Sequence, residues 1–216
     1  MRRGGARPAG GAGVRALLVV AHPRRSSLTF AAAAACAREI ERAGAEVEWA
    51  DLVGEGFDPV LRPPDEPDWA DPAKVYSPAV RAEMARIERN DATLIVFPVW
   101  WWSMPAVLKG WIDRVWNHGW AYGGRDYPHR CVWMIGIAGS GQAAYRKRGY
   151  DEAMRTQLEV GVLEYCGVAQ RRFELLYGAI DGASEAADVL LRAAALGALF
   201  ASAAQDEPKA HRKSPE

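Results

Sequence analysis

Cysteine is scarce in this chain of 216 residues, which contains only Cys36, Cys131 and Cys166. Three scattered cysteines without CxxC spacing indicate neither a disulfide framework nor a zinc site, so we expect small buried residues. The four histidines are also too far apart in the sequence for an HExxH-type metal motif. The sequence therefore implies no metal.

Charge of one sign is not in excess either. The chain carries 27 basic and 27 acidic residues, which give a formal net charge of +0. A balanced charge gives no support for binding to nucleic acid or to a strongly charged membrane surface. The phosphates of a nucleotide need only local donors, so a nucleotide ligand stays compatible with this composition.

Long apolar segments are missing as well. The longest apolar stretches have the length of a strand, well short of the ~20 residues needed to cross a bilayer, so we expect no membrane insertion. Residues 1–13 carry charges but lack the apolar core of a secretory signal. A cytoplasmic protein is the simplest expectation.

The chain does contain a regular alternation of strand and helix patterns. Residues 1–14 and 204–216 are Gly/Pro-rich or highly charged and are expected to be disordered tails, with one domain at residues 15–203. Strands are predicted at residues 16–21, 45–52, 92–97, 131–138 and 168–177. Helices are predicted at residues 27–43, 78–89, 103–117, 150–165 and 184–201. This alternation predicts an α/β sandwich built on a five-stranded parallel sheet.

The apolar content of each strand predicts the strand order. Strands one, three and four are continuous apolar runs, as expected for central strands covered by helices on both faces. Strand two alternates polar and apolar residues, and strand five carries Arg171, Arg172 and Glu174, so both are predicted to be edges. The order 2-1-3-4-5 follows, and its ligand crevice lies where strands one and three diverge.

The connection at residues 53–77 is rich in proline and shows no clear helix pattern. It is too long for a compact α/β unit unless it has a function of its own. We expect it to contact a cofactor or a second subunit.

Three consecutive tryptophans, Trp100, Trp101 and Trp102, follow the third strand. Ser103 is predicted to be the N-cap of the next helix, with Pro105 in the first turn. The loop therefore lies at the carboxyl end of a central strand, where open α/β sheets bind ligands. Three adjacent indoles cannot all enter one core. Either at least one stacks on a flat ligand, or one or two cover the sheet while another anchors a dimer.

The turn at residues 22–29 joins the first strand to a helix. Free N–H groups and the positive end of the helix dipole favour an anion there. Ser26, Ser27 and Thr29 add hydroxyl donors, and two adjacent arginines add charge. A helix cap alone would also explain Ser26 or Ser27. The turn has no Walker lysine, so a nucleoside triphosphatase is not indicated.

The loop after the fourth strand fits the pattern GxGxxA at residues 139–144. It follows the fourth strand instead of the first, and no acidic residue ends a following strand ~20 residues further on, so a Rossmann fingerprint is not indicated. Its small residues favour either a close approach of backbone N–H groups to a ligand or an ordinary tight turn.

Together these segments resemble the flavodoxin-like NAD(P)H:quinone oxidoreductases, a family that includes quinone reductases, modulators of drug activity and potassium-efflux ancillary proteins. The pattern PxxWxxxPAxLKGWxDRV at residues 98–115, followed by GxAY at residues 119–122, carries most of the resemblance. The turn at residues 21–29 and the Gly-Ser-Gly at residues 139–141 add to it. The resemblance covers about residues 15–200 and implies a flavodoxin-like three-layer sandwich.

The resemblance implies FAD as cofactor, with FMN as the alternative. The implied contacts of the phosphates are His22, Arg24, Ser26, Ser27, Leu28 and Thr29. The implied contacts of the isoalloxazine ring are Pro98, Val99, Trp100, Trp101, Trp102, Gly136, Ile137, Ala138, Gly139 and Ser140. The implied contacts of the substrate are Trp120, Ala121, Tyr122 and Gly123, which in isolation would be interpreted as an aromatic dimer contact.

Tyr145 is the catalytic residue that the resemblance implies. In related quinone reductases a tyrosine at this place and a histidine several residues later relay charge during hydride transfer. The histidine is missing here, and Tyr150 and Asp151 occupy its region. The relay is therefore altered, carried by Tyr150 or absent, and the alternative role of Tyr145 is to cover the ring.

The resemblance also implies a reaction and an assembly. NAD(P)H would reduce quinones or similar aromatic acceptors by a two-electron ping-pong reaction, in a homodimer with its active site at the subunit boundary. An FMN reductase or azoreductase of the same fold is one alternative. A non-catalytic electron carrier, redox sensor or ancillary subunit is another. The sequence leaves open FAD against FMN, NADH against NADPH, and the physiological acceptor.

Overall fold

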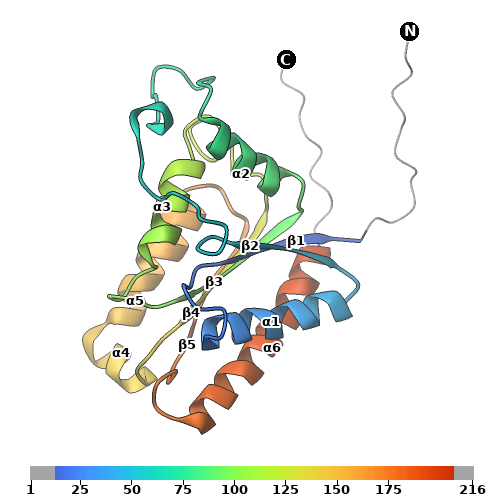
Figure 1. Cartoon of the computed structure of the whole chain (residues 1–216), viewed down its shortest axis with the longest axis vertical. Coiled ribbons are helices and arrows are strands. Elements are labelled where there is room, and N and C mark those ends of the chain that lie inside the picture. Colours follow the sequence, from blue (N-terminus) through green and yellow to red (C-terminus); the bar gives the residue numbers. More distant parts are fainter. Residues whose placement is uncertain (1–12, 207–216) are drawn as a thin grey trace.

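The predicted strands pair into one parallel sheet in a computed structural model, which describes residues 13–206. The strands are β1 (Arg15–Val20), β2 (Glu46–Asp51), β3 (Ala92–Pro98), β4 (Cys131–Ile137) and β5 (Gln170–Leu176). Their order is β2-β1-β3-β4-β5, which confirms the predicted order and its two edges (Figure 1). The predicted tails at residues 1–12 and 207–216 lie outside the described residues.

Helices cover both faces of the sheet (Figure 1). One face carries α1 (Leu28–Arg42) and α6 (Ala183–Gln205). The other face carries α2 (Pro78–Glu88), α3 (Ala106–Val115), α4 (Gln142–Arg148), α5 (Tyr150–Arg155) and the π-helical segment η2 (Thr156–Glu164). Each face has its own apolar core. Leu17 and Val19 enter one core and Leu18 and Val20 the other, which explains why the central strands are apolar at every position.

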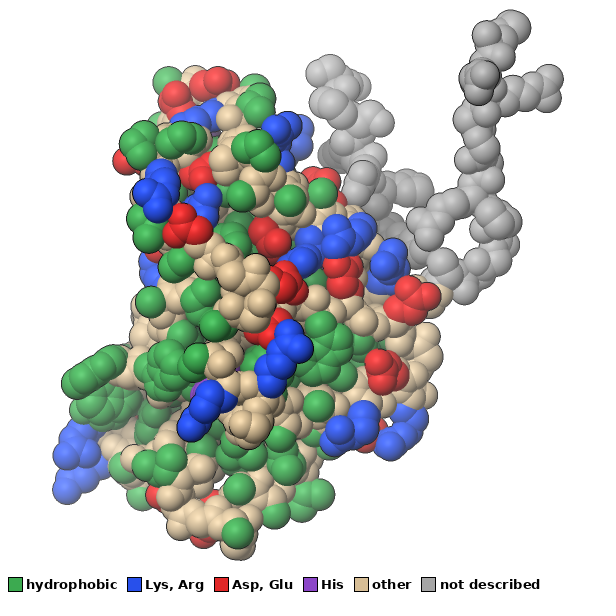
Figure 2. Space-filling model, viewed as in Figure 1, with side chains coloured by type: hydrophobic (Ala, Val, Ile, Leu, Met, Phe, Trp, Pro, Cys, Tyr) green, Lys and Arg blue, Asp and Glu red, His purple; other side chains and the backbone are tan. Residues whose placement is uncertain are grey.

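Ser27 is the N-cap of α1, since its Oγ accepts a hydrogen bond from the Phe30 N–H at 3.3 Å, so the cap considered for Ser26 or Ser27 falls on Ser27. The three cysteines are free and buried, which confirms the expectation for them. On the face shown in Figure 2, acidic and basic side chains are interspersed over the described residues, with no broad patch of one sign.

Helix α6 departs from the prediction in two ways. It runs to Gln205, so it includes the first residues of the segment expected to be a tail. By length and composition alone it could also cross a bilayer, contrary to the expectation that all apolar stretches are short. It packs along α1 instead, and at Gly197 an added Cβ would lie 2.6 Å from the Cα of Cys36. It therefore covers the sheet, as helices of an α/β sandwich do.

The long connection after β2 contains a single turn of 3-10 helix, η1 (Pro63–Asp65), and is fixed against α3. A Cβ on Gly110 of α3 would lie 2.2 Å from the carbonyl oxygen of Pro59. Further along, the Arg114 Nη2 donates to the Asp65 Oδ2 at 2.7 Å, and both side chains are buried. Asp65 also accepts from the backbone N–H and the hydroxyl of Ser77. This buried network holds an irregular segment in one position.

Candidate functional site

The turn after β1 brings His22, Ser27 and Thr29 together at the start of α1, all three buried. The Nδ1 of His22 accepts from the Arg24 N–H at 3.0 Å, so the proton of the neutral ring is on Nε2. Burial, with the nearby charge of Arg24, lowers the pKa of His22. At neutral pH this ring is therefore an uncharged donor at the carboxyl end of β1.

The other predicted residues of this turn differ in their availability. The side chains of Arg24 and Ser26 are exposed, and Leu28 is half-buried. The guanidinium of Arg25 contacts the buried carboxylate of Asp51, at the end of β2, at 2.9 Å. Its charge is therefore balanced within the chain. Arg24 is the cation of the turn that remains directed to solvent.

The three tryptophans form a tight turn. Trp100 and Ser103 exchange two backbone hydrogen bonds of 3.1 Å, with Trp101 and Trp102 between them. Both central residues have φ of +52°, a conformation that costs an L-residue about 1–2 kcal/mol and is found mainly for Gly and Asn. Such strain persists only where the surrounding structure enforces it, and it occurs preferentially at ligand sites.

Neighbouring elements hold this turn in place. The Val99 N–H donates to the Ile137 carbonyl at 2.9 Å, which ties the loop to β4. The ring of Trp102 lies 4.3 Å from that of Tyr150, and the ring of Trp100 lies 5.9 Å from His22. Trp101 is left 88% exposed. One indole thus covers the end of β1, one packs on α5, and one is presented to solvent.

The predicted cap at Ser103 is wrong. The backbone of Ser103 closes the tryptophan turn, and its Oγ forms a hydrogen bond with the Oε1 of Gln157 at 3.3 Å. Helix α3 begins at Ala106, with Pro105 in the N-cap position and no side chain bonded to the helix N–H groups. The hydroxyl was thus used to fix the loop to the π-helical segment instead of the helix.

The loop after β4 lies beside the tryptophan turn. Gly136, Ile137 and Ala138 are buried, and Ser140 is exposed. At Gly136 an added Cβ would lie 2.9 Å from the Cδ2 of Leu175 and 3.0 Å from the Cγ2 of Val99, so a side chain there would make these two residues shift. At Gly139 an added Cβ would lie 3.5 Å from its nearest neighbour, Ile180, so the packing leaves room for a side chain there. The backbone N–H groups of Gly139, Ser140 and Gly141 donate to no residue within the described range.

Tyr145 lies on α4, a short helix where the sequence predicted only a loop. It is buried, and its ring lies 6.0 Å from that of Tyr150 and 5.3 Å from that of Tyr177. Burial, with a contribution from Tyr177, raises the pKa of Tyr145. Tyr150 therefore connects Tyr145 with the tryptophan turn. Asp151 follows Tyr150 in the chain. The pKa of Tyr177 is raised mainly by burial and further by the charge of Asp151.

The predicted substrate segment lies at the opposite end of α3. Ala121 is completely buried, and the Trp120 Nε1 donates to the Glu88 Oε1 at 2.9 Å. Gly123 has a φ of +76°, and a Cβ there would lie 2.1 Å from the ring of His118. Helix α3 has ten residues, which correspond to about 15 Å. A single chain therefore does not bring this segment to the predicted cofactor residues.

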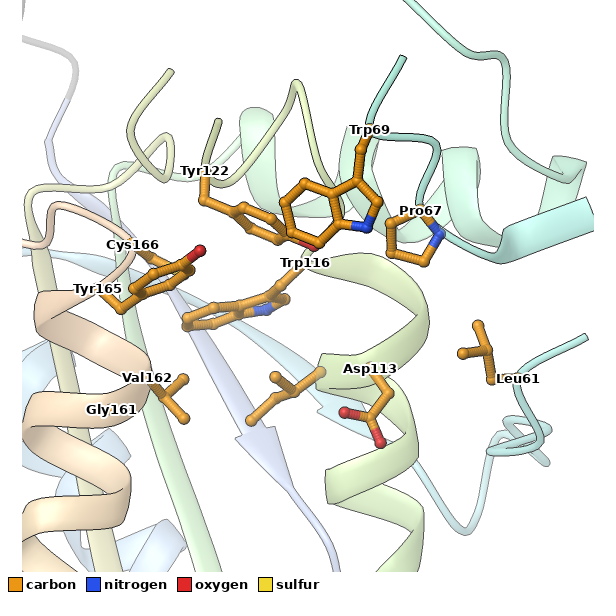
Figure 3. A pocket seen from close by; sticks show the side chains of 11 residues that line it. Leu61, Pro67, Trp69, Asp113, Trp116, Tyr122, Gly161, Val162, Tyr165 and Cys166 are labelled. Atoms are coloured by element: carbon orange, nitrogen blue, oxygen red, sulfur yellow. The ribbon is translucent and has the colours of Figure 1, made fainter. Parts of the chain in front are cut away.

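Tyr122 lines a cavity of about 410 Å³, which we call the aromatic slot (Figure 3). Trp69 and Tyr122 lie on one side of it, Trp116 lies opposite, and Tyr165 closes one end. Ring centroids are 5.7 Å apart for Trp69 and Tyr122, and 5.5 Å for Tyr122 and Tyr165. The Trp116 Nε1 is buried and has no hydrogen-bond partner among the described residues. The slot therefore has the shape and the apolar walls for a flat ring.

The sequence did not predict Trp69, Trp116 or Tyr165 as part of a site. Trp69 lies in the proline-rich connection, whose length alone indicated a function. Tyr165 directly follows the segment η2. Its N–H donates to the carbonyl of Val160, five residues back, which is the π-helical pattern. π-Helical turns are rare in proteins, and those that occur are often at functional sites. Nothing in the sequence indicated one here. Among residues 13–206, no three His, Cys, Asp or Glu side chains are grouped to hold a metal.

Residues 14–198 match a family model described as a flavodoxin-like fold. The chain is 38% identical over 155 residues to an uncharacterized NAD(P)H oxidoreductase, YcaK, of Escherichia coli (strain K12), a match that covers 71% of this chain and 79% of that protein. It is 30% identical over 189 residues to NAD(P)H dehydrogenase (quinone) 1 of Cavia porcellus, covering 76% and 68% of the two chains. The chain belongs to the flavodoxin-like NAD(P)H:quinone oxidoreductase family.

A solved structure supports this membership. NAD(P)H:quinone oxidoreductase from Methanothermobacter marburgensis superposes with a TM-score of 0.81 at 29% identity, covering 87% of this chain and 96% of that one. The protein is thus an oxidoreductase, as the sequence predicted.

Proposed function

We propose that this family member is a flavin-dependent NAD(P)H oxidoreductase of the cytoplasm, which reduces quinones or similar aromatic acceptors by a two-electron ping-pong reaction. FAD is the proposed cofactor and a homodimer the proposed assembly. One observation carries the proposal. Unpaired backbone N–H groups at Gly139, Ser140 and Gly141 lie beside a strained tryptophan turn, at the ligand crevice of the sheet.

The residues present fit a flavin. The free N–H groups of the loop after β4 match the polar edge of an isoalloxazine ring, and Gly139 leaves room for a ligand to approach. Trp100 and Trp101 supply flat apolar surface beside them. When bound, the flavin supplies the hydride and two-electron chemistry. The protein supplies orientation, donors for negative charge and exclusion of water.

The turn after β1 suits the phosphates. His22 offers a neutral Nε2–H donor, and the start of α1 offers free N–H groups. Arg24 adds a positive charge that no described residue neutralises. Arg25 contributes less, because Asp51 already holds its guanidinium.

Tyr145 is proposed to hold a proton close to the ring. Its raised pKa keeps the phenol protonated at neutral pH, so its O–H remains a donor toward negative charge that develops during reduction. Tyr150, in contact with both Tyr145 and Trp102, is the proposed replacement for the missing histidine.

A second copy of the chain is proposed to complete the site. The aromatic slot and the cofactor residues lie at opposite ends of α3, so one chain alone does not join them. A twofold partner could place its slot over the exposed Trp101 side of the cleft. The acceptor ring would then lie between the flavin and the partner's aromatic residues.

Three measurements test the proposal in order. An absorbance band near 450 nm in the purified or reconstituted protein shows flavin binding, and mass measurement of the released cofactor distinguishes FAD from FMN. Menadione-dependent oxidation of NAD(P)H then separates a reductase from a sensor. Sedimentation equilibrium gives the oligomeric state. A colourless protein that ignores FAD and FMN would contradict the proposal.

A further inference from the structure

A second cavity, of about 690 Å³, is lined in part by His118, Gly119 and Trp120, from the loop that also carries Tyr122. We call it the basic pocket. Its wall includes Lys74, Tyr76, Arg81, Met84, Trp120 and Arg125. Met84 and the two rings are apolar surface, and the lining contains three cations and no carboxylate.

Hydrogen bonds and close packing fix the walls of the basic pocket. The Tyr76 hydroxyl donates to the His118 carbonyl at 3.0 Å, and the Trp120 indole is fixed by its hydrogen bond to Glu88. Gly119 has a φ of +79°, and a Cβ there would lie 2.1 Å from the Pro72 carbonyl oxygen. The loop at Gly119 is thus packed directly against the backbone of the connection at Pro72.

The positive charge of the basic pocket is not neutralised by its own lining. The Lys74 Nζ donates to the Glu66 carbonyl at 2.6 Å, which leaves its charge unpaired. Arg81 and Arg125 form no side-chain hydrogen bond or ion pair with any residue in the described range. The nearby carboxylates of Asp68 and Asp71 accept from backbone N–H groups and do not line the cavity.

The pocket is separate from the proposed cofactor cleft. None of the predicted flavin contacts lines it, and α3 lies between the tryptophan turn and the loop after Trp116. It does share Trp120 and Gly123 with the predicted substrate segment. A ligand here would therefore be recognised next to the aromatic slot and away from the flavin phosphates.

We propose that the basic pocket binds the anionic group of a small aromatic molecule. A carboxylate, sulfonate or phosphate pairs with Arg81 and Arg125, whose planar forks suit such groups. The aromatic part packs on Met84 and the indole of Trp120. Two sources offer this chemistry: the phosphates of a nicotinamide nucleotide, or an anionic substituent on the acceptor.

The test measures binding alone. Isothermal titration of the full chain at low salt uses naphthalene-2-sulfonate as probe and the uncharged naphthalene-2-sulfonamide as its matched control. We expect the sulfonate to bind at least tenfold more tightly and to weaken as salt is added. Equal affinities, or no binding of the sulfonate at millimolar concentration, would overturn the proposal. No redox readout is used, so this result is independent of the proposed function.

Variants locate the site. Arg81→Ala and Arg125→Ala are each expected to weaken sulfonate binding about tenfold, because each removes one charged donor. Arg38→Ala, which removes an exposed arginine of α1, is expected to leave it unchanged. Full affinity in the Arg81→Ala/Arg125→Ala double variant, or an equal loss in Arg38→Ala, would reject the pocket. If NADP⁺ displaces the probe, the anionic group belongs to the nicotinamide nucleotide. If only aromatic anions displace it, the anionic group belongs to the acceptor.

Discussion

At the scale of single residues, Trp101 combines a strained backbone with a proposed role in flavin binding. Its φ of +52° is easily adopted by glycine and disfavoured for alanine. We expect Trp101→Gly to have a free energy of unfolding about 1 kcal/mol higher than Trp101→Ala, since both lose the indole and only one keeps the strain. Both variants should lose flavin retention to a similar extent. Urea denaturation measures the first effect, and equal stability of the two variants would show that the turn is unstrained.

Tyr145 permits a second prediction at this scale. Tyr145→Phe removes the hydroxyl and keeps the buried ring, so flavin affinity should change little. Flavin reduction by NAD(P)H should slow by roughly 10²-fold if the hydroxyl stabilises charge in the transition state. Stopped-flow bleaching at 450 nm measures the rate. The neighbouring Tyr177→Phe is the control, with a rate close to wild type. An unchanged rate in Tyr145→Phe would exclude this residue from the mechanism.

At the scale of elements, the buried pair of Asp65 and Arg114 fastens the long connection to α3. Burial alone would raise the pKa of Asp65, but hydrogen bonds from Arg114 and Ser77 outweigh it and leave the pKa lowered. Arg114→Leu leaves this carboxylate buried and unpaired, so we expect the free energy of unfolding to fall by about 3–5 kcal/mol. Chemical denaturation at pH 7 provides the measurement.

The matched control is an exposed pair in the same connection. Arg62 and Asp58 are 3.2 Å apart with side chains largely in solvent, so Arg62→Leu should cost less than about 1 kcal/mol. Adding Asp65→Asn to Arg114→Leu should recover part of the loss, because it removes the buried charge. Similar losses in Arg62→Leu and Arg114→Leu would mean that burial of the pair is unimportant.

What the sequence could predict at this scale depends on periodicity. The apolar runs around Leu18 and Ile95 predicted central strands, and the polar residues of β2 and β5 predicted edges, as observed. Ser103 could not be assigned, because a turn with two residues of positive φ depends on contacts with β4 and α5 that lie far away in the sequence. The aromatic slot was missed for the same reason. Trp69 and Tyr165 come from an irregular connection and a π-helical segment, neither of which has a repeating pattern.

At the scale of the whole molecule, the two ends of the sheet differ in how their polar groups are paired. The carboxyl end carries the strained tryptophan turn and the unpaired backbone N–H groups of the proposed flavin site. Close to the amino end, the buried ring of His129 is paired at both of its nitrogens. The His129 Nδ1 lies 2.7 Å from the Thr93 hydroxyl, and its Nε2 lies 2.8 Å from the Ile87 carbonyl and 2.9 Å from that of Asn90. The two carbonyls can only accept, so the Nε2 carries a proton, and the Thr93 hydroxyl can donate to the Nδ1 of a neutral ring.

The network around His129 predicts how stability depends on pH. Burial lowers the pKa of His129 from 6.5 to about 4. Between these values the unfolded chain binds a proton that the folded chain does not, so the stability due to neutral His129 is complete above pH 6.5 and falls as the pH drops toward 4. At about 1.4 kcal/mol per pKa unit, the loss amounts to about 3 kcal/mol. His129→Gln lacks this titration and should be less stable than wild type at pH 7, with a difference that shrinks steadily toward pH 4.5. Denaturation of both proteins at a series of pH values measures it. His22→Gln is the control, because His22 is the second histidine whose pKa is lowered. If the difference in free energy of unfolding between wild type and His129→Gln stays constant with pH, the buried ring does not titrate as described.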